Sequence, residues 1–150
     1  MRIVVDSNVV VSAILNKSGK IGQLLIFGRK NFDYYAPNLL KLEIKKHKFK
    51  LLEISKLSDD EFDRLRDELF ECITFISEEQ ISFDYWHNAL AFVREVDMDD
   101  IAFVALSDYL DAKLWTGDKR LLEGLERRGY DRGLTTGEIY QMWTDVGQSK

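Results

Sequence analysis

Cysteine and proline are almost absent from this chain, which has one of each among 150 residues. Its single cysteine, Cys72, cannot form an internal disulfide, and no cysteine–histidine cluster has the spacing of a zinc site. No apolar run is long enough to span a bilayer, and Asp6 interrupts the first apolar stretch, where a signal peptide is continuous. We therefore expect a reduced, soluble protein of the cytoplasm with no membrane segment.

Basic residues are outnumbered by acidic ones, 21 to 26, and the formal net charge is −5. This excludes a polybasic protein that binds nucleic acid by net charge, although a local basic patch remains open. The hydrophobic content of 45% and the charged content of 31% are ordinary for a globular protein. The length favours a single domain, which we expect over residues 1–146, with a frayed tail over residues 147–150.

Short β-rich runs alternate with helical patterns along the chain. Strands are expected at residues 2–5, 32–36, 72–76 and 112–116, with a short fifth strand near 130–134. Helices are expected at 9–15, 21–27, 37–49, 59–70, 83–96, 99–110 and 119–128, with a last one after 135. Pro37 is placed in a first helical turn, where proline is tolerated. The alternation predicts an α/β fold with three layers, a doubly wound and mostly parallel sheet of four to five strands with helices on both faces.

Acidic residues follow or flank the elements that meet at one edge of this sheet. Asp6 ends the first strand, and Asp118 follows the fourth. Asp99 and Asp100 precede an apolar helix, and Glu43 lies beside the apolar stripe of its own helix. Ligands of open parallel sheets bind in the crevice beyond the carboxyl ends of the strands. We therefore expect these carboxylates to gather there.

Gathering carboxylates has an electrostatic cost, because like charges raise each other's pKa values. A divalent cation offsets that cost, and oxygen ligands without cysteine or clustered histidine suit Mg²⁺ or Mn²⁺. Such a cation polarises a phosphodiester and lowers the pKa of a bound water. The alternative is structural, since each acid alone could be a helix cap or a solvated helix residue. Independent caps need not converge on one crevice, so the set is more specific than its members.

Several segments of the sequence resemble the PIN domain family. They are Ile3–Asn8, Glu43 on its helix, Asp99–Leu106 and Leu114–Leu121. The resemblance covers roughly residues 1–143 and is greatest to the small bacterial PIN proteins that are toxin components of toxin–antitoxin systems. It implies a metal-dependent ribonuclease with a PIN-like, doubly wound α/β fold.

The resemblance also implies roles for individual residues. Asp6, Glu43, Asp100 and Asp118 correspond to the family's four acidic positions, which hold one or two Mg²⁺ or Mn²⁺ ions. Asp99 matches an adjacent acid that is often present in this subgroup. Three further residues match polar positions beside the acids, namely Ser7, Asn8 and Thr116.

A basic cluster lies near Glu43, with five lysines between positions 41 and 50. It could be a solvated helix face, or a rim that contacts the phosphates of RNA despite the negative net charge. His47, one turn from Glu43, could line the crevice or lie on the surface. The candidate substrate-binding residues are Lys41, Lys45, Lys46, Lys48, Lys119 and Arg120.

We therefore expect a metal-dependent endoribonuclease that hydrolyses RNA phosphodiester bonds, forms a homodimer and is the toxin of a toxin–antitoxin system with a cognate antitoxin. Family members also act in RNA processing and decay, so membership alone does not imply toxicity. Two alternatives stay open: a non-catalytic module that binds RNA or protein, and a phosphatase-like or DNA-directed enzyme with the same metal chemistry. The apolar residues Val9–Val11 and Ile14–Leu15 could form a dimer or antitoxin groove, or belong to the core.

Overall fold

The computed structural model describes residues 1–148. A five-stranded parallel sheet with strand order β3-β2-β1-β4-β5 runs through its centre. This confirms the predicted α/β class and the parallel pairing. The strands are β1 (Arg2–Val5), β2 (Asp33–Pro37), β3 (Ile73–Ile76), β4 (Lys113–Trp115) and β5 (Gly133–Leu134).

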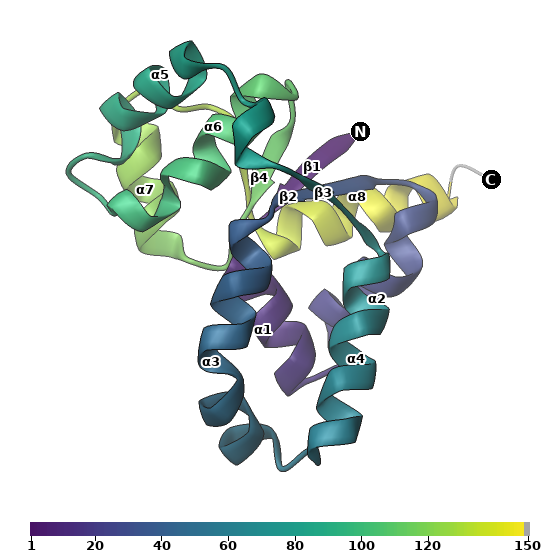
Figure 1. Cartoon of the computed structure of the whole chain (residues 1–150). Helices are drawn as coiled ribbons and strands as arrows, with labels where there is room; N and C mark the ends of the chain where they lie inside the picture. Colours follow the sequence, from purple (N-terminus) through teal and green to yellow (C-terminus); the bar gives the residue numbers. More distant parts are fainter. Residues whose placement is uncertain (149–150) are drawn as a thin grey trace.

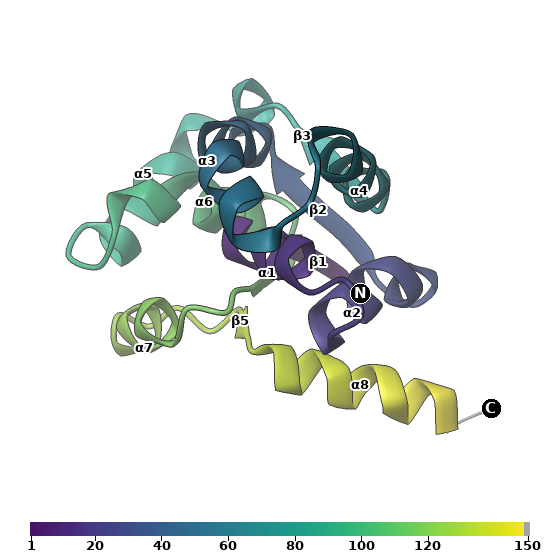
Figure 2. The ribbon, with the colours of Figure 1, turned by 90° about the horizontal axis from the view of Figure 1, so that it is seen from below.

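Helices cover both faces of the sheet, as Figures 1 and 2 show. One face carries α1 (Ser7–Leu15), α2 (Lys20–Phe27), α3 (Leu39–Ser55) and α4 (Asp59–Glu71), and the other carries α5 (Phe83–Val93), α6 (Ile101–Tyr109) and α7 (Lys119–Arg127). The last helix, α8 (Thr136–Gln148), packs against α2. Three short 3-10 helices complete the described elements: η1 (Gly28–Lys30), η2 (Glu78–Gln80) and η3 (Met98–Asp100).

The core is centred on β1 and α6. The β1 residues Ile3, Val4 and Val5 are fully buried because β1 has strands on both sides and helices on both faces. Helix α6 is buried from Ala102 to Ser107, since it packs across β1, β2 and β4 and against α5. Val9–Val10 of α1 also belong to this core, so burial explains these valines without a docking groove.

The start of α3 differs from the sequence prediction. Pro37 is the last residue of β2, paired with Ile76 of β3, so its placement in a first helical turn is wrong. The helix begins at Leu39 and continues past Phe49 to Ser55. Proline is tolerated here because the bond to Ile76 of β3 comes from the backbone N–H of Asn38, and β1 pairs with β2 only as far as Tyr35.

The end of the described chain belongs to α8. Thr135 and Glu138 form reciprocal side-chain to backbone bonds at its start, the arrangement of a capping box. The helix includes residues 147 and 148, and the rest of the tail expected over 147–150 lies outside the described residues. Within residues 1–148, no single helix is long and apolar enough to cross a membrane; only α1 together with the segment at 20–30 reaches that length, across a bend of 109°.

Candidate active site

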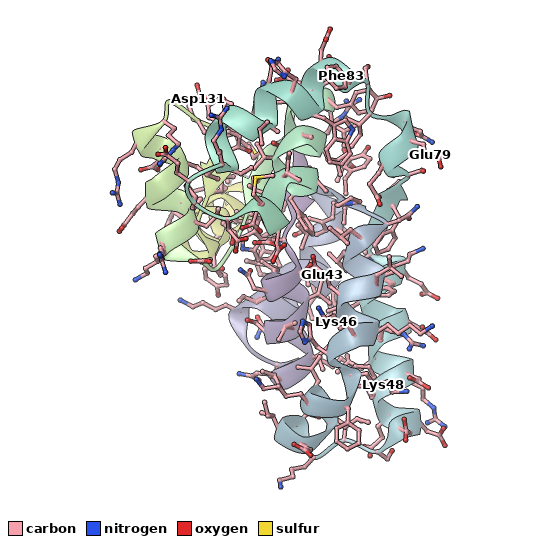
Figure 3. The ribbon with its side chains drawn as sticks, turned by 60° about the vertical axis from the view of Figure 1, so that its left-hand side comes forward. Glu43, Lys46, Lys48, Glu79, Phe83 and Asp131 are labelled. Carbon is pink, nitrogen blue, oxygen red and sulfur yellow. The ribbon has the colours of Figure 1, made fainter. Side chains whose placement is uncertain are left out.

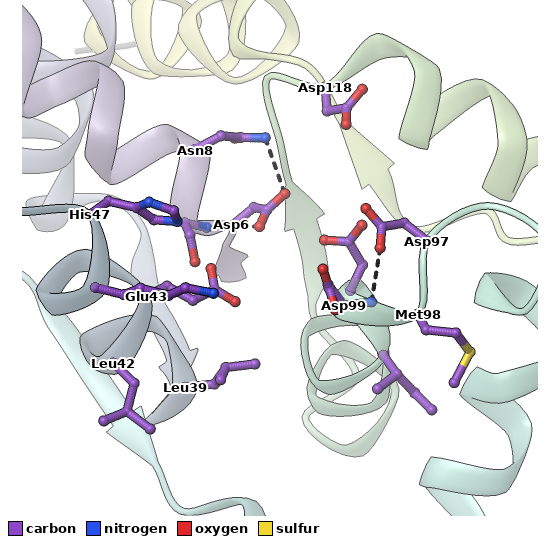
Figure 4. Close-up of a pocket in the computed structure, with 14 residues that line it drawn as sticks. Asp6, Asn8, Leu39, Leu42, Glu43, His47, Asp97, Met98, Asp99 and Asp118 are labelled. Carbon is purple, nitrogen blue, oxygen red and sulfur yellow. Dashed lines mark hydrogen bonds between the residues drawn. The ribbon is translucent and has the colours of Figure 1, made fainter. Parts of the chain in front are cut away.

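A pocket of about 570 Å³ opens where β1 and β4 end, at the point where the strand order reverses. The β1–α1 junction, α3 and η3 supply its walls, as Figure 4 shows. All four acids expected to form a site line this one pocket, although they come from distant segments of the chain. Its acidic residues are Asp6, Glu43, Asp97, Asp99, Asp100 and Asp118.

Asp6 is the most constrained of these acids. One oxygen, Oδ1, accepts the backbone N–H of Ser7 at 2.7 Å, and Oδ2 accepts the Thr116 hydroxyl at 2.8 Å and Asn8 Nδ2 at 3.2 Å. The residue is only 5% exposed, and this burial raises the pKa of Asp6 to about 6. The hydrogen bonds from Thr116 and Ser7 oppose that rise in the pKa, because they stabilise the charged form.

The hydroxyl of Thr116 links the ends of two strands. It donates to Asp6, and it accepts both Asn8 Nδ2 at 3.1 Å and the backbone N–H of Asp118 at 3.1 Å. Asn8 in turn accepts the backbone N–H of Gly117 at 3.0 Å through Oδ1. All three polar residues expected beside the acids therefore contact Asp6, and two of them also fix the segment that carries Asp118.

Asp118 has a structural role as well as a place in the pocket. Its Oδ1 accepts the backbone N–H of Leu121 at 3.1 Å, so this carboxylate is the N-cap of α7. Capping does not use up a carboxylate, which can accept about four hydrogen bonds or ligands. The helix-cap interpretation of Asp118 is thus correct, and it is compatible with a role in the pocket.

Asp100 is half-buried at the start of α6 and carries the largest shift among the acids of the pocket. The pKa of Asp100 is raised to about 8, first by burial and then by the neighbouring charges of Asp6, Asp97, Asp118 and Glu43, in that order of effect. Like-charge repulsion of this kind requires that the carboxylates lie close together. The pocket therefore holds concentrated negative charge.

Asp97 was missed as a candidate by the sequence analysis. Its carboxylate lines the pocket and accepts the backbone N–H of Asp99 at 2.9 Å, which caps η3. The predicted helix over 83–96 obscured it, because α5 in fact ends at Val93 and Asp97 begins the next turn. An aspartate two residues before a paired acid at a helix start is the signal that could have identified it.

Helix α3 supplies the wall of the pocket opposite η3. Glu43, Lys46 and His47 all line the pocket from this helix, and Leu39 and Leu42 continue the same wall with apolar side chains. The charge of Glu43 raises the pKa values of both Asp6 and Asp100, so Glu43 acts on the site across the crevice.

The lysines of α3 have different neighbours. Lys46 lines the pocket, whereas Lys48 Nζ lies 2.9 Å from Asp59 and 2.8 Å from Asp63 of α4. Figure 3 shows Glu43, Lys46 and Lys48 along this helix. Lys41 Nζ lies 4.3 Å from the ring centroid of Phe75 on β3.

The remaining candidate cations lie outside the main pocket. Lys45 and Lys119 are exposed. Arg120 lines a smaller cavity of about 120 Å³, together with Asp97 and Asp118, directly beside the acids. Arg120 of α7 and Lys46 of α3 thus each share a cavity with acidic side chains of the site.

A divalent cation fits the donor chemistry of this pocket. No group of three acidic or histidine side chains within residues 1–148 forms a ready-made ligand set. The hydroxyl of Ser7, however, is buried in the pocket wall and has no hydrogen-bond partner in the described part of the chain. Oxygen donors that repel one another, next to an unsatisfied hydroxyl, suit a hard cation such as Mg²⁺ or Mn²⁺. Asp6, Asp100, Asp118 and Glu43 are the residues that would hold it.

Comparison with known proteins agrees with this fold. A family model described as PIN domain matches residues 4–141. A search of the curated proteins finds no match to this chain. The chain is similar to one in the crystal structure of VapBC2 from Rickettsia felis bound to a DNA fragment from their promoter, with 15% identity and a TM-score of 0.67. That match covers 90% of this chain and 98% of the other, and at this identity it shows a shared fold.

Proposed function

The chain belongs to the PIN domain family, and on that premise we propose that it is a metal-dependent endoribonuclease that hydrolyses RNA phosphodiester bonds. The observation that carries the proposal is the convergence of Asp6, Glu43, Asp100 and Asp118 on one pocket at the switch point of the sheet. Burial raises the pKa values of Asp6 and Asp100, and the charges of neighbouring acids in the pocket add to the rise. A structural role alone does not require such a concentration of charge.

In this proposal Asp6, Asp100 and Asp118 bind Mg²⁺ or Mn²⁺ (one or two ions), Glu43 completes the site, and Asp99 is a candidate further ligand. A bound cation supplies Lewis-acid chemistry, since it polarises the phosphodiester and favours ionisation of water. Thr116 and Asn8 hold the Asp6 carboxylate in one orientation through their bonds to Oδ2.

The basic residues of α3 and α7 would contact the RNA backbone. Lys46 and Arg120 support this role best, because they lie against the acidic residues. Lys45 and Lys119 are exposed and accessible to a long substrate. Lys41 and Lys48 already contact other groups, so we assign them at most a secondary contribution.

We further propose that the protein is a toxin that acts in the cytoplasm as a homodimer and is neutralised by a cognate antitoxin protein. The fold similarity to the Rickettsia felis VapBC2 structure supports this proposal. Co-expression with the product of a small adjacent gene tests it. A toxin would arrest growth when it is expressed alone, and the neighbouring product would restore growth and co-purify with it.

An RNA-cleavage time course with Mn²⁺, Mg²⁺ or EDTA tests the nuclease function. Wild type should cleave only with metal, and Asp100→Asn should abolish cleavage without loss of fold. Asp84→Asn, an exposed aspartate of α5 that does not line the pocket, should cleave like wild type. Equal cleavage by Asp100→Asn would refute the site assignment.

A substrate panel separates the alternatives. Metal-dependent cleavage of DNA or of small phosphate esters in place of RNA would indicate the related hydrolase instead. RNA binding without metal and without cleavage of any substrate would favour a non-catalytic binding module.

A further inference from the structure

The outer face of α3 exposes large apolar side chains. Phe49 is 77% exposed and Leu42 is 62% exposed. They lie about two helical turns apart on the same side of the helix, which is about 10 Å along its axis. Leu42 lines the mouth of the acidic pocket. This face therefore begins at the pocket and extends away from it toward the α3–α4 turn.

Cationic side chains flank these apolar residues. Lys45, Lys46 and Lys50 are exposed, and no ion pair joins them to an acid anywhere in residues 1–148. Lys48, in contrast, is paired with Asp59 and Asp63 on the other side of the helix. The lysines that form no ion pair are thus the ones next to Leu42 and Phe49 on the outer face.

An exposed phenyl ring between free cations suits a single-stranded nucleic acid. Bases of a single strand stack on aromatic rings, while lysines contact the phosphates between them. The acidic pocket itself repels phosphates, so the affinity for the RNA backbone has to come from surfaces beside it. The outer face of α3 is the adjoining surface with both features.

We propose that this face, formed by Leu42, Lys45, Lys46, Phe49 and Lys50 and called the α3 strip below, binds the single-stranded RNA that flanks the cleaved bond. Phe49 stacks on a base, and the lysines contact phosphates. The proposal rests on the ribonuclease function proposed above, whose substrate it specifies as unpaired RNA.

Charge favours RNA over a second copy of the chain as the occupant. Around a two-fold axis the same patch meets itself, so a symmetric contact centred on the α3 strip would oppose its three lysines to three like charges. A polyanion complements them instead. The strip is also continuous with the pocket through Leu42 and Lys46, as a substrate path requires.

Fluorescence anisotropy with a labelled single-stranded RNA, measured in EDTA to prevent cleavage, tests this surface. Phe49→Ala should weaken the RNA affinity about fivefold or more, the lower range for loss of a stacked base, and Phe49→Trp should retain it. The matched control is Phe83→Ala. Phe83 is an equally exposed phenylalanine, 76%, on α5, well away from Lys48 in Figure 3, and its loss should leave the affinity unchanged.

The salt dependence of binding tests the lysines. Lys45→Ala and Lys50→Ala should each reduce the slope of log K against log salt by roughly 0.7, the value for one phosphate contact of a single strand. Lys30→Ala, an exposed lysine of η1, should not change the slope.

Three results would overturn the proposal. They are wild type that binds no RNA in EDTA, equal losses for Phe49→Ala and Phe83→Ala, and a Phe49→Ala variant that changes from dimer to monomer in light scattering while its RNA affinity stays the same. The last result would assign the strip to a second copy. Because the assay needs no metal and no cleavage, its outcome is independent of whether the nuclease function proposed above holds.

Discussion

Replacing Asp100 by asparagine should stabilise the metal-free protein while it removes the proposed activity. Burial and four neighbouring carboxylates raise the pKa of Asp100 from 3.8 to about 8. The folded protein therefore binds more protons than the unfolded chain between these pH values. The contribution of Asp100 to the free energy of unfolding is therefore fully present below about pH 4 and is lost as the pH rises through 8. Asparagine does not ionise, so the variant avoids this loss.

The size of the effect depends on how well solvent screens the site. A shift this large corresponds to several kcal/mol in a fully buried group, but Asp100 is only half-buried. With solvent screening we expect the Asp100→Asn variant to gain about 1–2 kcal/mol at pH 8. For a chain of this length that is an increase in Tm of roughly 2–8 °C, and the gain should be close to zero at pH 4.

Thermal unfolding in EDTA, followed by circular dichroism from pH 4 to pH 8.5, measures this difference. Asp99→Asn is the matched control, because it removes the same charge from an exposed neighbouring position and should change Tm less. A variant Asp100→Asn that is no more stable than wild type at pH 8 would refute the raised pKa that burial and the neighbouring acids give Asp100.

Two further substitutions test the contacts that position the acids. Thr116→Val removes the hydroxyl that bonds Asp6 and Asp118 and should lower the free energy of unfolding by about 1–3 kcal/mol in urea denaturation; a loss below 0.5 kcal/mol would contradict the network. Gly124→Ala places a Cβ 2.8 Å from Val96 Cγ2, between α7 and the turn before Asp97, and should destabilise the fold by about 1 kcal/mol. Adding Val96→Ala should recover part of that loss, and strictly additive effects would show that this contact is not the cause.

The sequence predicts those features that depend on local burial. The run before Asp6 is uniformly apolar because β1 is covered on all sides, and the acid after it can only lie where the strand ends. Helix α6 is predictable for the same reason, since an apolar surface all round requires a buried helix. Ser58 and Glu61 likewise predict the start of α4, because their spacing is that of a capping box. The structure contains both reciprocal capping bonds.

Features decided by distant partners are not predictable in this way. Pro37 belongs to β2 because it aligns with Ile76 of β3. Lys48 forms ion pairs with Asp59 and Asp63 of α4, and no pattern within α3 indicates these contacts. The sequence groups all the lysines of α3 as one basic cluster, whereas the fold assigns them to different faces.

Asp97 shows the same limit inside the site. Its neighbours suggest a continuing helix, and only the end of α5 at Val93 turns its carboxylate toward the pocket. The resemblance of motifs indicates which acids to expect, and the geometry adds one more acid and the hydrogen bonds that orient Asp6.

Calorimetric titration with Mn²⁺ at pH 7, repeated in two buffers with different ionisation enthalpies, tests the central claim most directly. A cation that binds these carboxylates displaces protons. Because the pKa of Asp100 is about 8, wild type should release close to one proton per ion bound, and Asp6→Asn and Asp100→Asn should lose most of the affinity. Absence of Mn²⁺ binding by wild type, or unchanged affinity and proton release in Asp100→Asn, would contradict a metal site in this pocket.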